Sequence, residues 1–264
     1  MVKYASLEEK IVPKEDCFIG AGYNTCEDLG FQAVDLFRTF KDEIGELERE
    51  EPIKPQVHSQ ILDLRSFTET FLHFFSNGSN AEFVSFQPDI FFLVADKLED
   101  NNIKVNSEIG GHSAVWALRA QLENCKAYIA ALPTQFNIKK LRLSDHRGEN
   151  LVFPHEMIDA PEDVNRHKYQ DRHFVLEYNK GDEILGFKAP RSNRFYFVHD
   201  PNGASLKQVE EYHRVADLIE EKPYRHLFGG YQLMQKLDLY EAESRLQTMV
   251  SEWFDMGQEV GPEG

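Results

Sequence analysis

Short apolar runs alternate along this chain with longer segments in which apolar residues recur at helical spacing. The run 17–23 predicts a strand, and the segment 27–44 places apolar residues from Leu29 to Phe37 at intervals that predict a helix. A second helix is predicted over 57–75, where large apolar residues share one face. The beginning of the chain therefore predicts a strand followed by two helices.

The middle of the chain repeats this alternation. Strands are predicted at 103–109 and 126–132, and a helix at 112–122 lies between them. The phenylalanine-rich segment 81–98 fits either one buried helix or two short elements, because periodicity does not separate these alternatives. Alternation of strands and helices is typical of a parallel sheet covered by helices, so we expect an α/β fold.

The pattern changes between 172 and 199. Three β-type runs follow one another through tight turns with no helix between them, at 173–178, 184–189 and 194–198. Such a run of strands predicts a small side sheet that acts as a lid. A helix, a strand and a helix then resume the alternation at 205–220, 224–228 and 238–254. We expect a single α/β domain over 1–264, with lid strands within about 172–199.

Composition narrows the classes of function. The 45 acidic against 29 basic residues give a net charge of −16, which repels nucleic acid and anionic membranes. Three cysteines without a C-x-x-C pair predict neither a disulfide framework nor a cysteine zinc site. The first residues lack the apolar core of a signal peptide, and no apolar run reaches about 20 residues. We expect a cytoplasmic protein that spans no membrane and binds no nucleic acid.

Candidate chemistry begins at the end of the first predicted strand. Asn24 and Asp28 lie four residues apart there, and an amide and a carboxylate can hold adjacent hydroxyls of a sugar. The same residues could instead cap the predicted helix and complement its dipole. Gly20 and Gly22 also suggest a dinucleotide-binding loop, although Thr25 replaces the third glycine of that motif. The residues alone leave these interpretations open.

Five blocks of the sequence resemble the ADP-dependent glucokinase family, and they occur in that family's order. The strongest spans His173–Asp200 and is similar to the metazoan enzymes nearly residue for residue. The others resemble the family's Asn-x-x-x-Asp sugar-binding junction, its Gly-x-Ala-Ala-Glu turn, its Gly-Gly-Asn/Gln-Ala turn and its late strand and turn, at Gly22–Asp28, Asn77–Glu82, Ile109–Ala114 and Leu227–Gln232. The blocks cover roughly Asp16 to Met234.

The resemblance implies a ribokinase-like fold whose full-length form transfers the β-phosphoryl group of ADP to a hexose such as glucose, with Mg²⁺. It also implies a role for Arg194 beside the transferred phosphoryl group, where a guanidinium can bind phosphoryl oxygens. The implied sugar site consists of Asn24, Asp28, Glu82, Gly110, Gly111, His112 and His173. His112 departs from the Asn or Gln usual in the family. Metazoan relatives are associated with the endoplasmic reticulum.

Three motifs of the family are not found. They are the Gly-x-Gly-Asp turn that carries the general base, and the Asn-x-x-Glu and His-x-Glu motifs for magnesium and nucleotide. Gly181-Asp182 lacks the first glycine, and the one Asn-x-x-Glu coincides with the sugar junction at Asn24. We therefore expect the C-terminal part of the fold and its base to be missing, and the chain to be nearly inactive as a kinase.

Two alternatives from other classes remain. One is a non-catalytic sugar-binding or regulatory module that keeps the hydroxyl-binding residues. The other is a dinucleotide-binding oxidoreductase that uses the loop of Gly20 and Gly22. Binding of a hexose favours the first alternative or the kinase, and binding of a nicotinamide cofactor favours the second.

Overall fold

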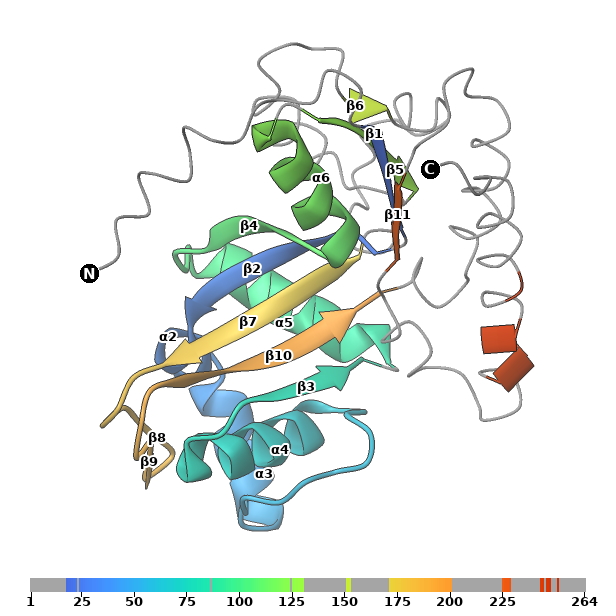
Figure 1. Cartoon of the computed structure of the whole chain (residues 1–264). Helices are drawn as coiled ribbons and strands as arrows, with labels where there is room; N and C mark the ends of the chain where they lie inside the picture. The colour runs from blue at the N-terminus through green and yellow to red at the C-terminus, as the bar shows by residue number, and fades with distance from the viewer. Residues whose placement is uncertain are drawn as a thin grey trace. The chain divides into compact units, whose positions relative to one another are not determined.

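The computed structural model describes residues 18–22, 24–85, 87–123, 125–130, 151–152, 171–200, 225–228, 243–244, 246–247 and 251. The chain divides into two compact units, each with its own sheet (Figure 1). The first unit comprises 1–26, 109–163 and 202–264, and the second comprises 27–108 and 164–201. Within the described ranges, no helix is long and apolar enough to cross a bilayer.

The second unit is built on a five-stranded mixed sheet with the strand order β3-β10-β7-β2-β4. Its strands are β2 (Cys26–Gln32), β3 (Ala81–Val84), β4 (Asn106–Gly110), β7 (Arg172–Tyr178) and β10 (Asn193–His199). β7 and β10 are antiparallel, whereas β2 pairs in parallel with β7 and β3 pairs in parallel with β10. The short hairpin of β8 (Glu183–Ile184) and β9 (Phe187–Lys188) lies between β7 and β10 in sequence.

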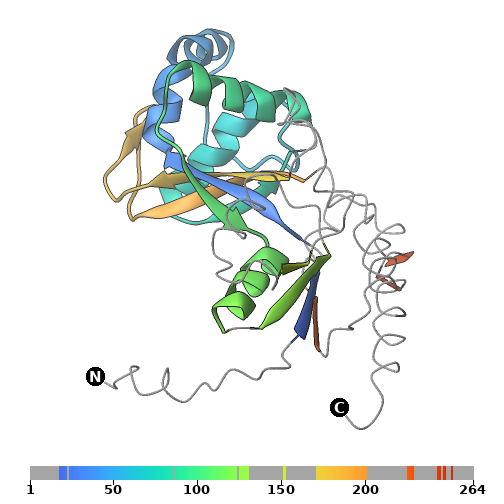
Figure 2. The ribbon, with the colours of Figure 1, turned by 90° about the horizontal axis from the view of Figure 1, so that it is seen from above.

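Helices cover one face of this sheet, as Figure 2 shows. They are α2 (Ala33–Thr39), α3 (Lys41–Glu50), α4 (Leu64–Asn77) and α5 (Pro88–Asp100). Side chains alternate between the faces of a strand, so Phe31, Phe174 and Phe195 all point into the helical layer, where they are buried. The ring of Phe91 stacks on that of Phe174 with 4.1 Å between the centroids. Burial of each such ring contributes roughly 2–3 kcal/mol to folding.

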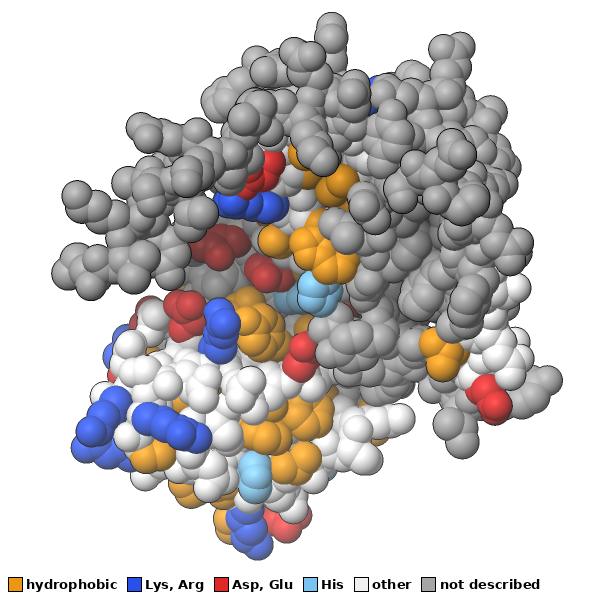
Figure 3. All heavy atoms as spheres, in the orientation of Figure 1, with side chains coloured by type: hydrophobic (Ala, Val, Ile, Leu, Met, Phe, Trp, Pro, Cys, Tyr) orange, Lys and Arg blue, Asp and Glu red, His pale blue; other side chains and the backbone are white. Residues whose placement is uncertain are grey.

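The opposite face of the sheet is more polar, and we call it the polar face. It carries Asp28, Glu82, His173, Arg194 and Tyr196, which alternate along their strands with the buried phenylalanines. Figure 3 views the molecule in the orientation of Figure 1 and shows acidic, basic and apolar side chains lying close together on the described surface. A sheet face with this mixture is suited to bind a ligand that has both polar and apolar parts.

Helix α4 has specific signals at both ends. The Asp63 side chain accepts a hydrogen bond from the Ser66 backbone N–H at 2.7 Å, and the Ser66 hydroxyl in turn accepts from the Asp63 N–H. This capping box fixes the first turn. Gly78 ends the helix in the left-handed conformation with φ of 63°, which a side chain would disfavour. The turn between β9 and β10 contacts this end, because Arg191 Nε donates to Gly78 O at 2.6 Å.

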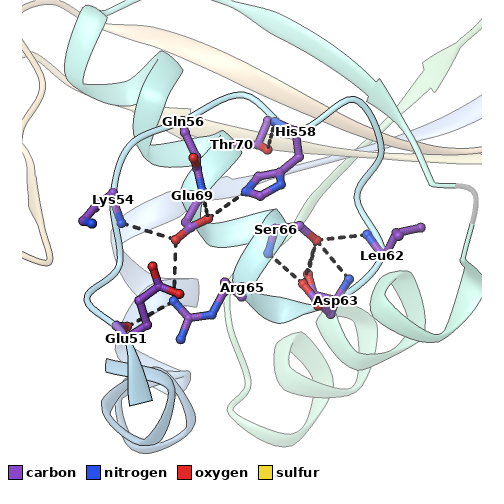
Figure 4. A network of polar contacts seen from close by, with 10 residues as sticks. All are labelled: Glu51, Lys54, Gln56, His58, Leu62, Asp63, Arg65, Ser66, Glu69 and Thr70. Carbon is purple, nitrogen blue, oxygen red and sulfur yellow. Dashed lines mark hydrogen bonds and ion pairs between the residues drawn. The ribbon is translucent and has the colours of Figure 1, made fainter. Parts of the chain in front are cut away.

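The segment 51–62 is held against α4 by a network of polar contacts, and one buried carboxylate makes several of them (Figure 4). Glu69 is 4% exposed, and its Oε2 lies 2.7 Å from His58 Nε2 and accepts from Gln56 Nε2 at 2.5 Å. The Lys54 N–H points at Oε1 over 3.4 Å. Burial alone would raise the pKa of Glu69, but these hydrogen bonds outweigh it and the pKa is lowered. The Glu69 carboxylate therefore holds residues 54–58 of this segment against α4.

The first unit contains a parallel sheet with the order β11-β1-β5-β6. Its strands are β1 (Phe18–Gly22), β5 (Lys126–Ala130), β6 (Leu151–Val152) and β11 (Arg225–Phe228). Helix α6 (His112–Leu122) packs on this sheet through Ala114, Ala117 and Ala120. These small side chains let the helix approach Ala127 and Ile129 closely, and a compact core follows.

Several predicted elements are confirmed. They include the strands at 17–23, 103–109 and 126–132 and the helix at 112–122, with shifts of a few residues at most. The strand predicted at 224–228 is β11, and the segment 81–98 resolves into β3 and α5. The helix predicted at 205–220 lies outside the described residues. The helix at 238–254 is described only at 243–244, 246–247 and 251, where it is helical.

Other predictions need correction. The helix predicted over 27–44 is wrong for its first part, because 26–32 forms β2 between β7 and β4. The helix predicted over 57–75 begins only after Asp63, where the cap lies. The strands within 172–199 do exist, but β7 and β10 do not form a side sheet, because they join β2 and β3. β8 and β9 pair only as a short two-stranded hairpin.

Candidate functional site

The junction that carries Asn24 connects two strands. β1 ends at Gly22 and β2 begins at Cys26, so the expected strand-to-helix junction is wrong. Asn24 therefore cannot cap a helix that begins there, and Asp28 lies within β2, where no helix dipole acts on it. The capping and dipole roles considered for this pair of residues are thus removed.

The same geometry excludes the dinucleotide-binding loop. Gly20 and Gly22 lie inside β1, and their Cα partners are Tyr128 and Ala130 on β5. The next described element is strand β2, whereas a dinucleotide site needs a helix N-terminus directly after the glycine loop. The oxidoreductase interpretation is therefore not supported by this fold.

Within the first unit, the turn before α6 contacts the Asn24 backbone. Asn24 O accepts a hydrogen bond from the Ser113 N–H at 3.1 Å and another from the Ser113 hydroxyl. Gly111 has φ of +83°, and a Cβ at this position would lie only 2.6 Å from Thr25 Cα. Glycine is thus required for this close approach. Gly110 ends β4, Gly111 precedes α6, and His112 is the first residue of α6.

Within the second unit, an imidazole is flanked by two carboxylates on the polar face. His173 Nδ1 lies 3.3 Å from Asp28 Oδ1, and His173 Nε2 lies 3.0 Å from Asp200 Oδ1. The side chains of His173 and Asp200 are 13% and 15% exposed, and that of Asp28 is 30% exposed. Both nitrogens of the ring are thus engaged, and the orientation of the ring is fixed.

The strand register explains how these residues meet. Asp28 on β2 is the Cα partner of His173 on β7, which is in turn the partner of Val198 on β10. Tyr196, two residues before Val198, is the partner of Glu82 on β3. Because alternate residues face the same side, these side chains lie on the polar face in adjacent rows. Arg194 occupies the next row, opposite Glu177.

The charges of this cluster affect the pKa of Glu82. Loss of hydration raises the pKa of Glu82; the carboxylates of Asp200 and Asp28 add to this rise, and His173 partly offsets it. Glu82 itself is exposed, so solvent screens much of the effect. Two carboxylates in contact with one imidazole, with Glu82 on the same face of the sheet, form an acceptor-rich site, which suits a ligand with several hydroxyl donors.

The structure thus places the predicted site residues in two groups. Asp28, Glu82 and His173 lie together in the second unit, with Arg194 on the same face. Asn24, Gly110, Gly111 and His112 belong to the first unit. Sequence reasoning missed Asp200 and Tyr196. The signal for both was strand alternation, because Tyr196, Val198 and Asp200 follow Arg194 at intervals of two.

Comparison with known proteins now adds to this geometry. The family model described as ADP-specific phosphofructokinase/glucokinase conserved region matches residues 18–260. A curated relative, the ADP-dependent glucokinase of Bos taurus, is 23% identical over 238 residues, which are 90% of this chain and 43% of the relative. The chain therefore spans less than half the length of that relative.

Solved structures agree at the level of the fold. A phosphofructokinase from Pyrococcus horikoshii with AMP matches with a TM-score of 0.52 at 13% identity, over 84% of this chain and 50% of that one. An ADP-dependent kinase in complex with fructose-6-phosphate and ADPβS matches with a TM-score of 0.52 at 18% identity, over 88% of this chain and 45% of that one. These neighbours confirm the expected ribokinase-like α/β fold. Since the family model covers most of the chain, the protein belongs to the ADP-specific phosphofructokinase/glucokinase family.

Proposed function

We propose that this chain binds a neutral hexose on the polar face of the second unit, as the sugar-binding side of an ADP-dependent hexose kinase. The arrangement of His173 between Asp28 and Asp200, with Glu82 in electrostatic range, carries this proposal. Asp28 and Glu82 accept hydrogen bonds from sugar hydroxyls. His173 holds Asp28 in position, because its other nitrogen is anchored by Asp200.

The charge of the site favours glucose over a sugar phosphate. Asp28, Asp200 and Glu82 together oppose the approach of a phosphate dianion, whereas hydroxyl groups donate to carboxylates favourably. Arg194 lies on the same face in the next row but one from His173, and its guanidinium is the group we assign to the transferred phosphoryl. The site thus separates a hydroxyl-binding end from a cationic end.

We include ADP, AMP and magnesium in this proposal because the chain belongs to an ADP-specific kinase family. Carboxylate oxygens are the ligands that magnesium prefers, and the described residues bring Asp28 and Asp200 to the same imidazole. Because each of these carboxylates already contacts a nitrogen of His173, the pair does not fit a magnesium site. We also assign no general base among the described residues.

Titration calorimetry of the whole chain with glucose tests the proposal. Asp28→Asn removes one charged acceptor and should weaken glucose binding by about tenfold or more. Glu177→Gln is the matched control, because Glu177 is an exposed carboxylate on the same face, opposite Arg194. It should leave the affinity unchanged, and fructose 6-phosphate should bind more weakly than glucose.

A coupled assay for hexose phosphate, run with ADP and magnesium, separates the kinase from a sugar-binding module. Turnover supports the kinase. Glucose binding without turnover supports a non-catalytic module that uses the same site. If neither glucose nor another hexose binds at millimolar concentration, the proposal is wrong.

A further inference from the structure

Tyr196 lies on the polar face between the rows of His173 and Arg194, and neither the family resemblance nor the sequence motifs assigned it a role. It is half-buried, and its neighbours along β10, Phe195 and Phe197, are fully buried in the core on the other face. Across the sheet, Tyr196 pairs with Glu82 on β3 and with Val175 on β7. Its side chain therefore rises between a carboxylate and an apolar side chain.

The ring of Tyr196 is also held along its own strand. The guanidinium carbon of Arg194, two residues earlier, lies over the ring at 5.3 Å from the centroid. This cation–π contact restrains the ring. In the other direction along the polar face lies the row of Asp28, His173 and Val198. Tyr196 thus stands between Arg194 and the hydroxyl-binding carboxylates.

The nearby charges also affect the pKa of the Tyr196 phenol. Loss of hydration raises the pKa of Tyr196, Arg194 partly offsets this rise, and Asp28 and Glu82 add to it. The phenol consequently stays neutral at physiological pH and keeps its O–H as a donor. A neutral aromatic ring with a donor at its tip can contact both the apolar and the polar parts of a sugar.

We infer that Tyr196 is a specificity-determining residue of the sugar site, whose ring packs against the C–H face of the bound hexose. Asp28 and Glu82 bind hydroxyl groups at the same time, and Arg194 fixes the orientation of the ring. This inference rests on the proposed hexose binding. It follows a general feature of small-molecule sites, in which aromatic surface supplies contact area and a few polar groups supply orientation.

Tyr178 offers a matched control within the same sheet. It lies on β7 with its ring in the core, packed against Phe75 and Phe71, and its hydroxyl donates to Ser79 O at 2.7 Å. The two tyrosines occupy neighbouring strands but opposite faces. Substitution of Tyr178 should therefore affect folding, and substitution of Tyr196 should affect ligand binding.

The experiment measures the glucose affinity and the melting temperature of Tyr196→Ala, Tyr196→Phe and Tyr178→Phe. Tyr196→Ala should weaken glucose binding about tenfold or more, the loss expected from roughly 60 Å² of apolar contact. Tyr196→Phe keeps the ring and should lose only about twofold to tenfold, the contribution of one hydrogen bond. Tyr178→Phe should bind glucose normally and melt at a lower temperature.

Saturation-transfer NMR gives a second readout that a purely structural residue would not change. Glucose C–H protons should receive saturation from aromatic protons in the wild type and in Tyr196→Phe, and less in Tyr196→Ala. If Tyr196→Ala binds glucose as tightly as the wild type, the inference is overturned while the proposed function stands. If Tyr196→Ala does not fold, Tyr196→Leu takes its place. Saturation transfer to glucose that is as strong in folded Tyr196→Leu as in the wild type would also overturn the inference. If the wild type itself binds no hexose, the proposed function fails first.

Discussion

The substitution Gly111→Ala tests whether the turn that contacts Asn24 requires a glycine. The φ of +83° at Gly111 costs an L-residue about 1–2 kcal/mol. A Cβ would also press on the backbone of Asn24 and lie 2.6 Å from Thr25 Cα, and relief of such overpacking costs about 1–3 kcal/mol. Gly111→Ala should therefore destabilise the first unit by roughly 2–5 kcal/mol.

Two other glycines separate these contributions. Gly186 has φ of +78°, but no atom lies within 4 Å of the place that a methyl group would take, so Gly186→Ala should cost only the conformational term of about 1–2 kcal/mol. Gly45 lies inside α3 with nothing within 4 Å, and Gly45→Ala should stabilise by about 0.5–1 kcal/mol, because alanine loses less entropy in a helix.

Urea unfolding of the three variants provides the measurement. Circular dichroism follows both units, and tryptophan fluorescence reports on the first unit through Trp116 in α6. Two probes are needed because two units can unfold separately. If Gly111→Ala costs no more than Gly186→Ala, the close approach to Asn24 and Thr25 does not constrain this position, and the reasoning is refuted.

Three further predictions concern single side chains. Because the pKa of Glu69 is lowered from 4.5, its ionised form adds stability that is lost as the pH falls through the folded-state pKa. Glu69→Gln should therefore lower the free energy of unfolding at pH 7 by roughly 1–3 kcal/mol. Urea titrations of this variant should also show a weaker dependence of stability on acid pH. Burial raises the pKa of Tyr178 to about 12, so stability should fall between pH 10 and 12, and Tyr178→Phe should make that loss smaller. Because the pKa of Glu82 is raised, its ionised form destabilises the folded state as the pH rises through that pKa. Glu82→Gln should therefore slightly raise the melting temperature at pH 7 and weaken glucose binding. A lower melting temperature would contradict this prediction.

The α/β class and many elements were predictable because local signals agree with the tertiary structure. The His112–Leu122 helix follows a glycine turn and matches its prediction, and β7 and β10 are rich in the β-branched and aromatic residues that favour strands, such as Val175, Phe195 and Phe197. Such consistency between local pattern and fold is what makes sequence reasoning reliable.

The prediction for the region after Asn24 was wrong because a strand periodicity and a helix periodicity overlap there. Leu29 and Phe31 belong to β2, but Leu29 also lies at helical spacing from the apolar residues of α2. Only the parallel pairing with β7, more than 140 positions away in sequence, selects the strand. The membership of β7 and β10 in a sheet with β2 and β3 depends on the same non-local pairing, which no local pattern contains.

The candidate site was predictable in its parts. Asp28, Glu82 and His173 came from a resemblance in short blocks, and the sheet register explains why they share one face. Asp200 and Tyr196 belong to no separate motif, and their positions on the polar face follow from alternation along β10 and just beyond it, combined with the partners on β7 and β3. Site residues that are defined by cross-strand position are found only once the pairing is known.

A crystal structure of the chain grown with glucose tests the central claim most directly. We predict sugar density on the polar face, with hydroxyl groups within hydrogen-bonding distance of Asp28 and Glu82. The His173 ring should remain between Asp28 and Asp200. Sugar bound elsewhere, or carboxylates on this face that make no contact with it, would contradict the account.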